Sequence, residues 1–305
     1  MFPLTFEQPK ISQRAAFEKL AYDTGTRSCQ YAFPAIYSLR EKYDTELCLT
    51  GNAAFLRSLS RTPGRVDYFA PLCPADRFAD ALTCIEQFAA ADGRPYAFFG
   101  LTAEQAAALD TYVPRRYRIT EDRDWAEYLY DVQPLATLEG SGLKQKRKEA
   151  RQCRNHLGDR LTVEPLQAQH TDEVLSFQHK WLAAHDETGE DASLAGENRA
   201  IEIAMAEYDA LGLSGVIVRI DGEIAGYSYG CAIGRDTYDI LVQKADAEVK
   251  FLYRVVFQES VRLCAQGFRY INAEEDIGIA GLRALKLSYR PAFLLGKYRA
   301  EVVEA

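Results

Sequence analysis

The sequence has few of the residues that build metal centres and disulfide frameworks. Its 305 residues include four histidines and seven cysteines. No two cysteines form a Cys-x-x-Cys pair, and the histidines, which lie between His156 and His185, show no His-Glu-x-x-His spacing. An odd number of scattered cysteines is typical of reduced thiols in a cytosol rather than of disulfides or a zinc ribbon. We therefore expect a cytoplasmic protein without a metal site.

Long apolar runs are also missing. No stretch approaches the roughly 20 apolar residues that a membrane-spanning helix needs. The first residues, M-F-P-L-T-F-E-Q-P-K, have neither a basic start nor an apolar core, so we expect no signal peptide. The formal net charge is -8. This balance argues against indiscriminate binding to nucleic acid or anionic membranes, although it says nothing about local basic patches.

The composition is otherwise that of an ordinary globular protein, with 48% hydrophobic and 26% charged residues. A chain of this length holds one large or two medium domains. The composition shifts in residues 131–142, which contain Pro134 and two glycines. We therefore expect an N-terminal domain over residues 1–134 and a C-terminal domain over residues 135–305.

Apolar periodicity predicts helices and strands in both halves. In the first half we expect helices at 13–21, 74–91 and 103–109, the last of them capped by Thr102, and strands at 43–49, 66–69, 95–100 and 124–130. In the second half we expect helices at 144–155, 171–184, 197–211 and 248–265 and strands at 161–163, 215–220, 223–233, 237–243 and 270–272. Asp221-Gly222 predicts a hairpin turn. The second half resembles a GNAT acyltransferase domain in element order, and the first half a looser version. We therefore expect an α+β fold of tandem GNAT-like domains with mixed sheets.

One segment, Lys144–Asn155, is strongly basic although the chain is acidic. On a helix, five basic residues would share one stripe, because residues three and four apart lie on the same face. They are Lys144, Arg147, Lys148, Arg151 and Arg154. One interpretation is a solvated face on a docked helix. The other is a contact with an anion or with RNA phosphates, since like charges on one stripe repel one another without a partner.

In the stretch from Tyr270 to Tyr298, acidic and basic residues lie close together in the sequence. Three consecutive acids follow a short apolar strand, two glycines lead into a helix with two basic residues, and a final strand ends at Tyr298. The residues concerned are Glu274, Glu275, Asp276, Arg283, Lys286 and Tyr289. A strand, an acidic turn, a basic helix and a return strand predict a polar pocket at the end of a sheet.

Several segments carry a resemblance to a known family. They are Tyr31–Tyr37, Tyr128–Tyr130, Gly142–Asn155, Asn272–Gly278, Gly281–Pro291 and Lys297–Tyr298. Together they resemble the stand-alone relatives of the phosphatidylglycerol lysyltransferase C-terminal domain, which are tandem GNAT-fold proteins. The resemblance implies transfer of an aminoacyl group from aminoacyl-tRNA to a lipid head group. Characterised members of the family also carry a large transmembrane domain, which this sequence lacks, so we expect a lipid-like or small acceptor.

Aminoacyl transfer needs a group that takes the acceptor's proton and a group that stabilises the oxyanion. We expect catalytic roles for Glu274, Glu275, Asp276 and Tyr289. One acid would bind a substrate ammonium and another would assist proton transfer. We expect substrate-binding roles for Arg283, Lys286, Ser228 and Tyr298. Ser228 lies between two glycines of the hairpin's second strand, where a substrate can approach the backbone closely.

Five of these residues also have a structural interpretation. Asp276 can cap the following helix. Arg283 and Lys286 can pair with the neighbouring acids. Tyr289 and Tyr298 can be buried aromatics with satisfied hydroxyls.

The turn before the helix at 248–265 argues against coenzyme A as the usual donor. GNAT enzymes that use acetyl-CoA hold its pyrophosphate on a glycine-rich turn at this place, through backbone N–H groups and the helix dipole. Here the turn reads Q-K-A-D-A-E-V-K and has no glycine. Its acids, Asp246 and Glu248, would repel a pyrophosphate. We therefore expect no bound cofactor, aminoacyl-tRNA as co-substrate, and acyl-CoA only as the less favoured donor.

Two classes of function stay open. The first is an aminoacyl or acyl transferase, and the second is a non-catalytic binding protein that has kept the fold and the pocket. On the first hypothesis, Asp276→Asn and Lys286→Ala lower activity without unfolding the protein. Loss of folding in both would mark the two residues as structural.

Overall fold

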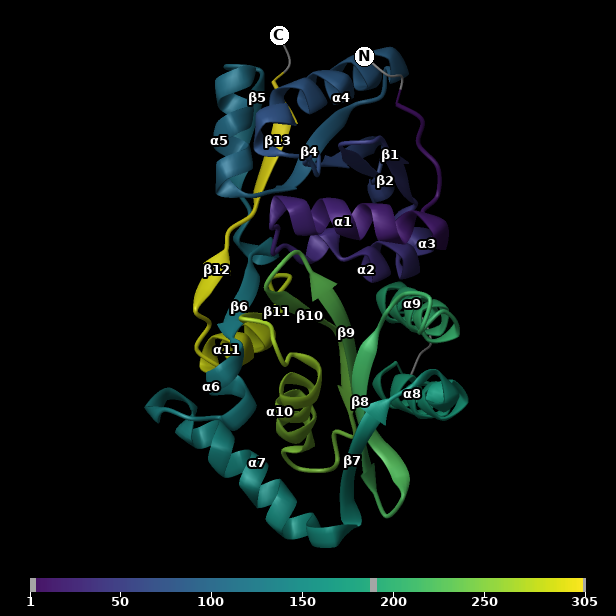
Figure 1. Cartoon of the computed structure of the whole chain (residues 1–305), viewed down its shortest axis with the longest axis vertical. Coiled ribbons are helices and arrows are strands. Elements are labelled where there is room, and N and C mark those ends of the chain that lie inside the picture. The colour runs from purple at the N-terminus through teal and green to yellow at the C-terminus, as the bar shows by residue number, and fades with distance from the viewer. Residues whose placement is uncertain (1–3, 187–190, 304–305) are drawn as a thin grey trace.

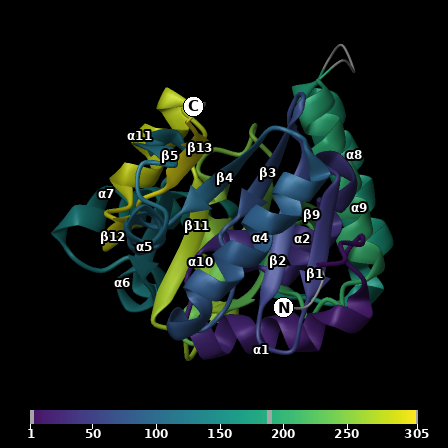
Figure 2. The ribbon, with the colours of Figure 1, turned by 90° about the horizontal axis from the view of Figure 1, so that it is seen from above.

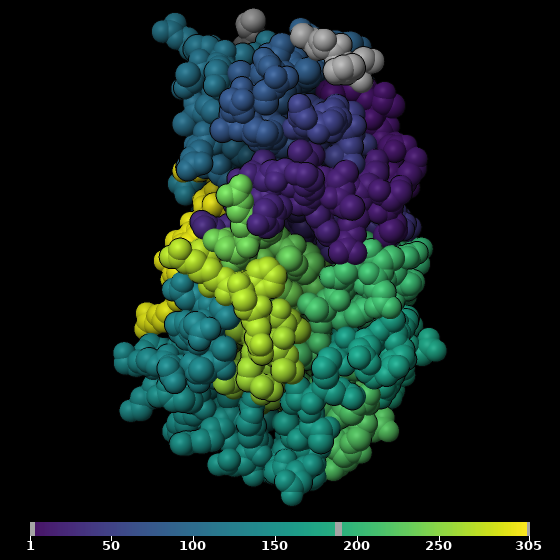
Figure 3. Space-filling view, viewed as in Figure 1, coloured from purple at the N-terminus to yellow at the C-terminus, as the bar shows by residue number. Residues whose placement is uncertain are grey.

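The computed structural model describes residues 4–186 and 191–303. Within these residues the strands form two sheets, which lie one above the other in Figure 1. The N-terminal helices lie between the sheets, and in Figure 3 their purple surface covers the junction of the upper and lower parts. Residues 1–3 belong to the segment for which we expected no signal peptide, and they lie outside the described residues.

The first sheet has the strand order β1-β2-β3-β4-β13-β5. Its strands are β1 (Thr45–Leu49), β2 (Ala54–Thr62), β3 (Arg65–Phe69), β4 (Tyr96–Leu101), β13 (Tyr298–Val302) and β5 (Tyr117–Glu121). Only β3 and β4 pair in parallel. Two helices, α4 (Phe78–Asp92) and α5 (Ala103–Tyr112), pack on this sheet through an apolar core. Thr102 and Gln105 form a capping box at the start of α5, which confirms the predicted cap.

The second sheet has the strand order β12-β6-β11-β10-β9-β8-β7. Its strands are β12 (Phe293–Leu295), β6 (Glu127–Asp131), β11 (Tyr270–Glu275), β10 (Thr237–Ala245), β9 (Glu223–Ile233), β8 (Ser214–Ile220) and β7 (Leu161–Leu166). Only β10 and β11 pair in parallel. The predicted hairpin is confirmed, since both turn residues, Asp221 and Gly222, have positive φ values as a type I′ turn requires.

Helices cover both faces of the second sheet (Figure 2). One face carries α6 (Val132–Thr137), α7 (Lys144–Leu157) and α10 (Leu252–Cys264). The other face carries α1 (Arg14–Thr24), α2 (Phe33–Ser38), α8 (Thr171–His185) and α9 (Ala192–Ala206). The core on this second face also includes Leu47, Phe69 and Phe99 of the first sheet, so α1 and α2 are shared between the sheets. No described helix combines the length and the apolarity needed to cross a bilayer.

The remaining helices are short. They are α3 (Arg40–Tyr43), α11 (Ala280–Ser288) and the 3-10 turns η1 (Ile11–Gln13), η2 (Cys29–Tyr31), η3 (Ala75–Arg77), η4 (Arg123–Trp125), η5 (Ser141–Leu143), η6 (Gly158–Arg160) and η7 (Ala168–His170). The sequence did not predict α2, β2 or β5. The predicted helix at 248–265 begins only at Leu252, because Phe251 has φ 69° and interrupts the helical backbone.

The two sheets exchange strands across the predicted domain boundary. β6 precedes residue 134 but pairs with β11 and β12 of the second sheet. β13 comes last in the chain but pairs with β4 and β5 of the first sheet. The domain boundary at 134/135 stays a prediction. The two sheets are not separated at that point of the chain, since each contains a strand from the other side of it. The predicted final strand ending at Tyr298 is wrong, because β12 ends at Leu295 and Tyr298 starts a strand of the other sheet.

Candidate functional site

The backbone pairing between β10 and β11 ends early and opens the second sheet. The two strands pair only from Thr237 with Tyr270 to Asp239 with Asn272. Beyond this point β10 continues along β9 to Ala245, with a register shift after Ile240, while β11 continues along β6. Asp239 therefore lies where the two parallel strands part.

Adjacent residues of β11 reach the same site because the strand is irregular at its end. Side chains normally alternate between the two faces of a strand. Glu274 has a left-handed backbone with φ 55°, and the pairing with β6 shifts between Asn272 and Glu275. Both Glu274 and Glu275 consequently interact electrostatically with Asp239. A non-glycine residue in this conformation costs about 1–3 kcal/mol and is typical of functional sites.

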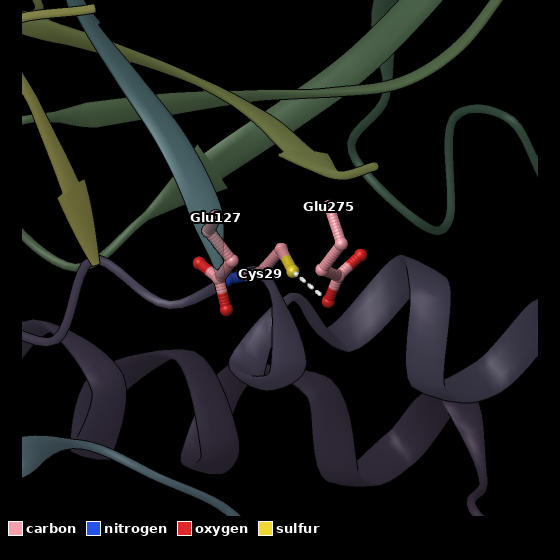
Figure 4. Close-up of side chains that lie close together, drawn as sticks. All are labelled: Cys29, Glu127 and Glu275. Atoms are coloured by element: carbon pink, nitrogen blue, oxygen red, sulfur yellow. Dashed lines mark hydrogen bonds between the residues drawn. The ribbon is translucent and has the colours of Figure 1, made fainter. Parts of the chain in front are cut away.

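Four acids gather at this place, and we name them the carboxylate cluster: Glu127, Asp239, Glu274 and Glu275. Figure 4 shows two of them, with Glu127 from β6 and Glu275 from β11 on either side of Cys29. The cysteine comes from η2, in the N-terminal segment between the sheets. The cluster therefore joins segments that are far apart in the sequence.

Glu127 is the structural member of the carboxylate cluster. One of its oxygens lies 2.5 Å from the Lys297 ammonium and accepts the Ser28 hydroxyl at 2.7 Å. The other accepts the Cys29 backbone N–H at 2.9 Å and the Asn272 side-chain amide at 2.5 Å. Burial alone raises the pKa of Glu127, but Lys297 and these donors hold it below its ordinary value. Its acceptor capacity is used up.

The other three carboxylates have unused acceptor capacity. Asp239 is fully buried, and among the described residues neither of its oxygens has a hydrogen-bond partner. Glu275 receives the Cys29 thiol at 3.4 Å and its own backbone N–H. The Glu274 carboxylate has no hydrogen bond or ion pair within the described part of the chain. Buried acceptors in native proteins are nearly always satisfied, so this group points to a ligand that supplies donors.

Burial and mutual repulsion change the protonation of these acids. Burial and then Glu275 raise the pKa of Glu274 to about 8. Burial and then Glu274 raise the pKa of Asp239 well above its ordinary range. Burial and then Glu127 raise the pKa of Glu275. A group that titrates near neutral pH can take and return a proton during a reaction.

Lys286, for which the sequence predicted substrate binding or pairing with the neighbouring acids, is brought to the carboxylate cluster. Its ammonium donates to the carbonyl oxygen of Ala273 at 2.6 Å and to that of Glu275. Burial lowers the pKa of Lys286, while Glu274 and Glu275 oppose that effect. Two of its three N–H donors are thus fixed, and the ammonium offsets part of the negative charge.

Asp276 does not join the carboxylate cluster. Its carboxylate pairs with Arg283 at 2.7 Å and Arg123 at 3.1 Å and accepts the Tyr128 hydroxyl at 2.5 Å. Burial alone would raise the pKa of Asp276, but these partners hold it well below its ordinary value. The residue is not the N-cap of α11 either, since Ile279 occupies that position. The ion pair with Asp276 agrees with the structural interpretation of Arg283, whereas Asp276 is held by this pairing rather than by the capping that the sequence suggested.

Asp276→Asn is expected to lower the free energy of unfolding by about 2–3 kcal/mol, because it leaves charged donors without their acceptor. The pKa of Asp276 is depressed in the folded state, so its contribution is present above the ordinary value of 3.8 and is lost as the pH falls below it. Urea unfolding at several pH values checks this. The exposed Asp110→Asn on α5 serves as the control and should change little.

Three further predicted residues lie away from the carboxylate cluster. Ser228 is fully buried and its hydroxyl lies 3.1 Å from that of Ser260 on α10, because side chains alternate along β9 and this one faces the α10 side. Tyr289 packs on Phe257 in the same core, where burial raises the pKa of Tyr289 to about 12. Tyr298 packs in the core of the first sheet. For Tyr289 the structural interpretation describes the observed contacts, and Ser228 is likewise buried in a core rather than in a pocket.

The basic stripe forms as predicted on α7. Four of its five members are exposed and form no ion pair within the described residues: Lys144, Arg147, Lys148 and Arg151. Arg154 instead pairs with the largely buried Glu259 of α10. Lys146, which the stripe does not include, is buried and lies 4.8 Å from the Tyr289 ring centroid. The exposed four residues, which we call the α7 basic face, keep their charge available.

The turn before α10 is unsuited to a pyrophosphate in the way the sequence indicated. The Asp246 carboxylate accepts the backbone N–H of Glu248 at 2.9 Å, so it occupies an amide that a phosphate would need. A cavity of about 600 Å³ lies beside this turn. Its polar lining residues include Gln152, His156, Arg160, Glu248 and Lys250.

A metal ion does not suit the described arrangement, although Cys29, Glu127 and Glu275 present ligand atoms within 4.8 Å of one another. Both oxygens of Glu127 already accept strong donors. Burial and then the two acids raise the pKa of the Cys29 thiol well above its ordinary range, which keeps it protonated. The expectation that the protein holds no metal stays a prediction.

Comparison with known proteins identifies the family. The family model for the C-terminal part of phosphatidylglycerol lysyltransferase matches residues 23–301. The chain belongs to the phosphatidylglycerol lysyltransferase C-terminal family. No curated protein sequence matches it.

Solved structures of this family and of related proteins have the same fold. A conserved protein of unknown function from Bacteroides thetaiotaomicron is 27% identical, with 98% of this chain and 100% of that chain covered and a TM-score of 0.92. The structure of L-PGS from Bacillus licheniformis is 16% identical, with 97% and 93% covered and a TM-score of 0.68. FemX is 10% identical, with 98% of both chains covered and a TM-score of 0.61. The predicted α+β fold of tandem GNAT-like type is thereby confirmed.

Three charged residues at the site were not predicted from the sequence. They are Glu127, Asp239 and Lys297. Glu127 and Asp239 are single acids inside otherwise apolar strands, W-A-E-Y-L-Y and T-Y-D-I-L-V-Q. Lys297 follows a similar apolar run. A lone charge in a buried strand is rare unless it is paired, and that rarity was the available signal.

Proposed function

We propose that this member of the phosphatidylglycerol lysyltransferase C-terminal family is an aminoacyltransferase. It would move an aminoacyl group from aminoacyl-tRNA to a lipid-like or small acceptor. The observation that carries this proposal is the carboxylate cluster, in which the buried Asp239 and the half-buried Glu274 and Glu275 lack their full complement of donors. An aminoacyl group carries an ammonium, which supplies up to three N–H donors and a positive charge.

The reaction would proceed by direct attack on the aminoacyl ester. The acceptor's hydroxyl or amine attacks the ester carbonyl carbon, and its proton passes to the Glu274 carboxylate. The C–O bond to the ribose of the tRNA then breaks, and the proton returns to the ribose oxygen that leaves. The pKa of Glu274, about 8, suits a group that must both accept and release this proton. The remaining N–H of Lys286 would stabilise the developing oxyanion.

The α7 basic face favours a polyanionic donor. Four exposed basic residues without acidic partners bind a phosphate backbone through counterion release. An acyl-CoA donor is the second candidate, since the cavity of about 600 Å³ lies beside the start of α10 with Lys250 in its lining. The acids of that turn weigh against it, because Asp246 already takes a backbone amide.

A donor screen tests the proposal. Purified protein is incubated with labelled aminoacyl-tRNA or with acetyl-CoA, and with a panel of lipid and amine acceptors, and products are identified by mass spectrometry. Transfer from aminoacyl-tRNA is the expected result. Turnover with acetyl-CoA alone would refute the tRNA-dependent reaction. Binding of ligands without turnover of any donor would leave the protein as a non-catalytic binder on this fold.

Replacing Lys144, Lys148 and Arg151 together with glutamine is expected to weaken tRNA binding at least about tenfold. The slope of log K against log salt concentration should also become less steep by roughly two to three units, because each lost phosphate contact reduces the slope by about one unit. Filter binding over a series of salt concentrations measures both. The matched control replaces three exposed basic residues on other elements, Lys19, Arg77 and Arg118, with the same change in net charge. Equal losses in both variants would show that only net charge matters.

A further inference from the structure

Arg61 lies in an aromatic cage between the two sheets. It belongs to β2, and its guanidinium carbon lies 4.4 Å from the ring centroid of Tyr43, 4.5 Å from that of Phe99 and 5.1 Å from that of Trp125. Phe69 is at 5.7 Å. Rings stack on the flat faces of a guanidinium and leave its N–H edge available for an acceptor.

No acid neutralises this arginine. Within the described residues Arg61 forms no ion pair, and its buried Nε has no hydrogen-bond partner. Its electrostatic neighbours include Glu275 of the carboxylate cluster and Asp67. Asp67 is already bonded to Thr62 at 2.6 Å and to Arg65 at 3.1 Å. A buried donor without an acceptor costs about 1–3 kcal/mol, and more when it is charged, so the arrangement calls for an anionic ligand.

Two more donors without acceptors lie at the same place. The Arg299 guanidinium lies 5.3 Å from the Phe99 ring centroid, the ring that Arg61 also covers, and it forms no ion pair within the described part of the chain. Its electrostatic neighbour Asp122 makes no salt bridge with it. The side-chain amide nitrogen of Gln30 is buried without a partner, and this side chain lies against Gly100, next to Phe99.

We propose that Arg61 and Arg299 form an oxyanion site, and that the acceptor substrate carries a phosphate or carboxylate that binds there. The acceptor's role rests on the proposed function, whereas the oxyanion site itself does not. Planar guanidinium groups bind phosphate and carboxylate oxygens in a bidentate manner. Arg299 is two residues beyond Lys297, so a single short segment supplies one cation to each of the two sites.

The position of the site assigns it to the acceptor rather than to the tRNA. The helix that carries the α7 basic face packs through Ala150, Cys153 and Leu157 on the core that includes α10, on one side of the second sheet. Phe69 and Phe99, which line the arginine cage, belong to the core on the opposite side of that sheet, together with α1 and α2. The carboxylate cluster lies on this same side, beneath η2. The substrate would therefore place an anionic group at Arg61 and its nucleophile at the carboxylate cluster.

Binding of simple oxyanions tests the proposal without any tRNA or transfer. Calorimetry is carried out with inorganic phosphate, with glycerol 3-phosphate, with acetate and with uncharged glycerol. We expect the charged probes to bind wild-type protein, glycerol not to bind, and Arg61→Gln to weaken phosphate binding by about tenfold or more. Arg299→Gln provides a second variant outside the cage and is expected to weaken binding as well.

Arg57→Gln is the matched control. Arg57 is also buried against aromatic rings, 4.4 Å from the Phe6 centroid and 5.2 Å from that of Phe88, but it pairs with Glu46 at 2.6 Å. This variant should lose stability and keep wild-type affinity for phosphate. Unchanged affinity in both Arg61→Gln and Arg299→Gln, or an equal loss in Arg57→Gln, would overturn the proposal, as would the absence of any oxyanion binding by wild type.

Vesicles distinguish the two sources of a phosphate group. If the acceptor is a lipid, vesicles of phosphatidylglycerol bind wild type more tightly than vesicles of phosphatidylcholine, and Arg61→Gln removes the difference. If it is a small molecule, soluble glycerol 3-phosphate shows the Arg61 dependence and the two kinds of vesicle bind alike. Both results support the oxyanion site. Oxyanion binding that depends on Arg61, together with no transfer from aminoacyl-tRNA, would refute the proposed function and leave this site standing.

Discussion

Replacing Lys297 with methionine is expected to reduce the free energy of unfolding by about 3–5 kcal/mol, which is a large part of a typical domain's stability. Lys297 is fully buried, and its ammonium lies 2.5 Å from the Glu127 carboxylate. Methionine fills a similar volume but leaves that carboxylate charged and buried without its cation. Urea unfolding at neutral pH, followed by circular dichroism, measures the change.

A double-mutant cycle separates charge from packing in this prediction. Glu127→Gln alone leaves the ammonium unpaired and is also expected to destabilise the protein. The double variant Glu127→Gln with Lys297→Met removes both charges of this pair, so it should be more stable than the Lys297→Met single variant. Additive losses in the double variant would contradict the ion-pair explanation and indicate that packing at the two positions dominates.

The Glu127–Lys297 pair also explains why the two sheets do not follow the order of the chain. Lys297 lies between β12 of the second sheet and β13 of the first. Its ammonium is held by Glu127 on β6 and by the Ser28 hydroxyl at 2.6 Å, in the segment between the sheets. The chain passes from the second sheet to the first at Lys297, and the buried ion pair with Glu127 of the carboxylate cluster holds it there.

Local chemistry made much of the fold predictable. The Asp221-Gly222 turn, the Thr102 cap and the apolar spacing of the helices each act over a few residues, and the structure has all three features. The exchange of β6 and β13 between sheets depends on pairing across more than a hundred residues. No local pattern encodes such pairing, because loop-closure and packing energies of the whole chain decide it.

The candidate site divides in the same way. Consecutive acids at the end of a strand drew attention to Glu274 and Glu275, and their partner Lys286 lies on the helix that follows. The sequence could not assign Asp276 to Arg283 and Arg123, because the left-handed backbone at Glu274 changes which side chains point together. Alternation along an ideal strand would have put Glu274 and Asp276 on one face.

The contribution of distant segments was even less accessible. Arg61 lies within β2, a strand of nine residues that the sequence did not predict, and its aromatic neighbours come from four other elements. An unpaired arginine looks like any surface arginine in a sequence. Only the packed structure shows that its Nε is buried without a partner and that a second arginine lies over the same ring.

Glu274→Gln is expected to lower the transfer rate by roughly 10²–10⁴-fold, the usual contribution of a general base. Glutamine has the same shape but cannot take the acceptor's proton. The base acts when deprotonated, so kcat/KM of the wild type should rise with pH below about 8 and level off above it. The variant should lose that rise. Exposed Glu223→Gln, at the hairpin turn, is the control and should keep the wild-type rate and pH profile.

Stability measurements separate catalysis by Glu274 from a role in folding. The pKa of Glu274 is raised in the folded state, so the folded protein holds this proton more tightly than the unfolded chain. The contribution of Glu274 to stability should therefore fall as the pH rises from 4.5 to about 8. Glu274→Gln removes that fall and should be more stable than wild type at pH 8 and above. If Glu274→Gln is as stable as expected but transfers at the wild-type rate, Glu274 is not the base and remains only a binder of the substrate ammonium. If the variant loses both rate and stability, Glu274 has a role in folding.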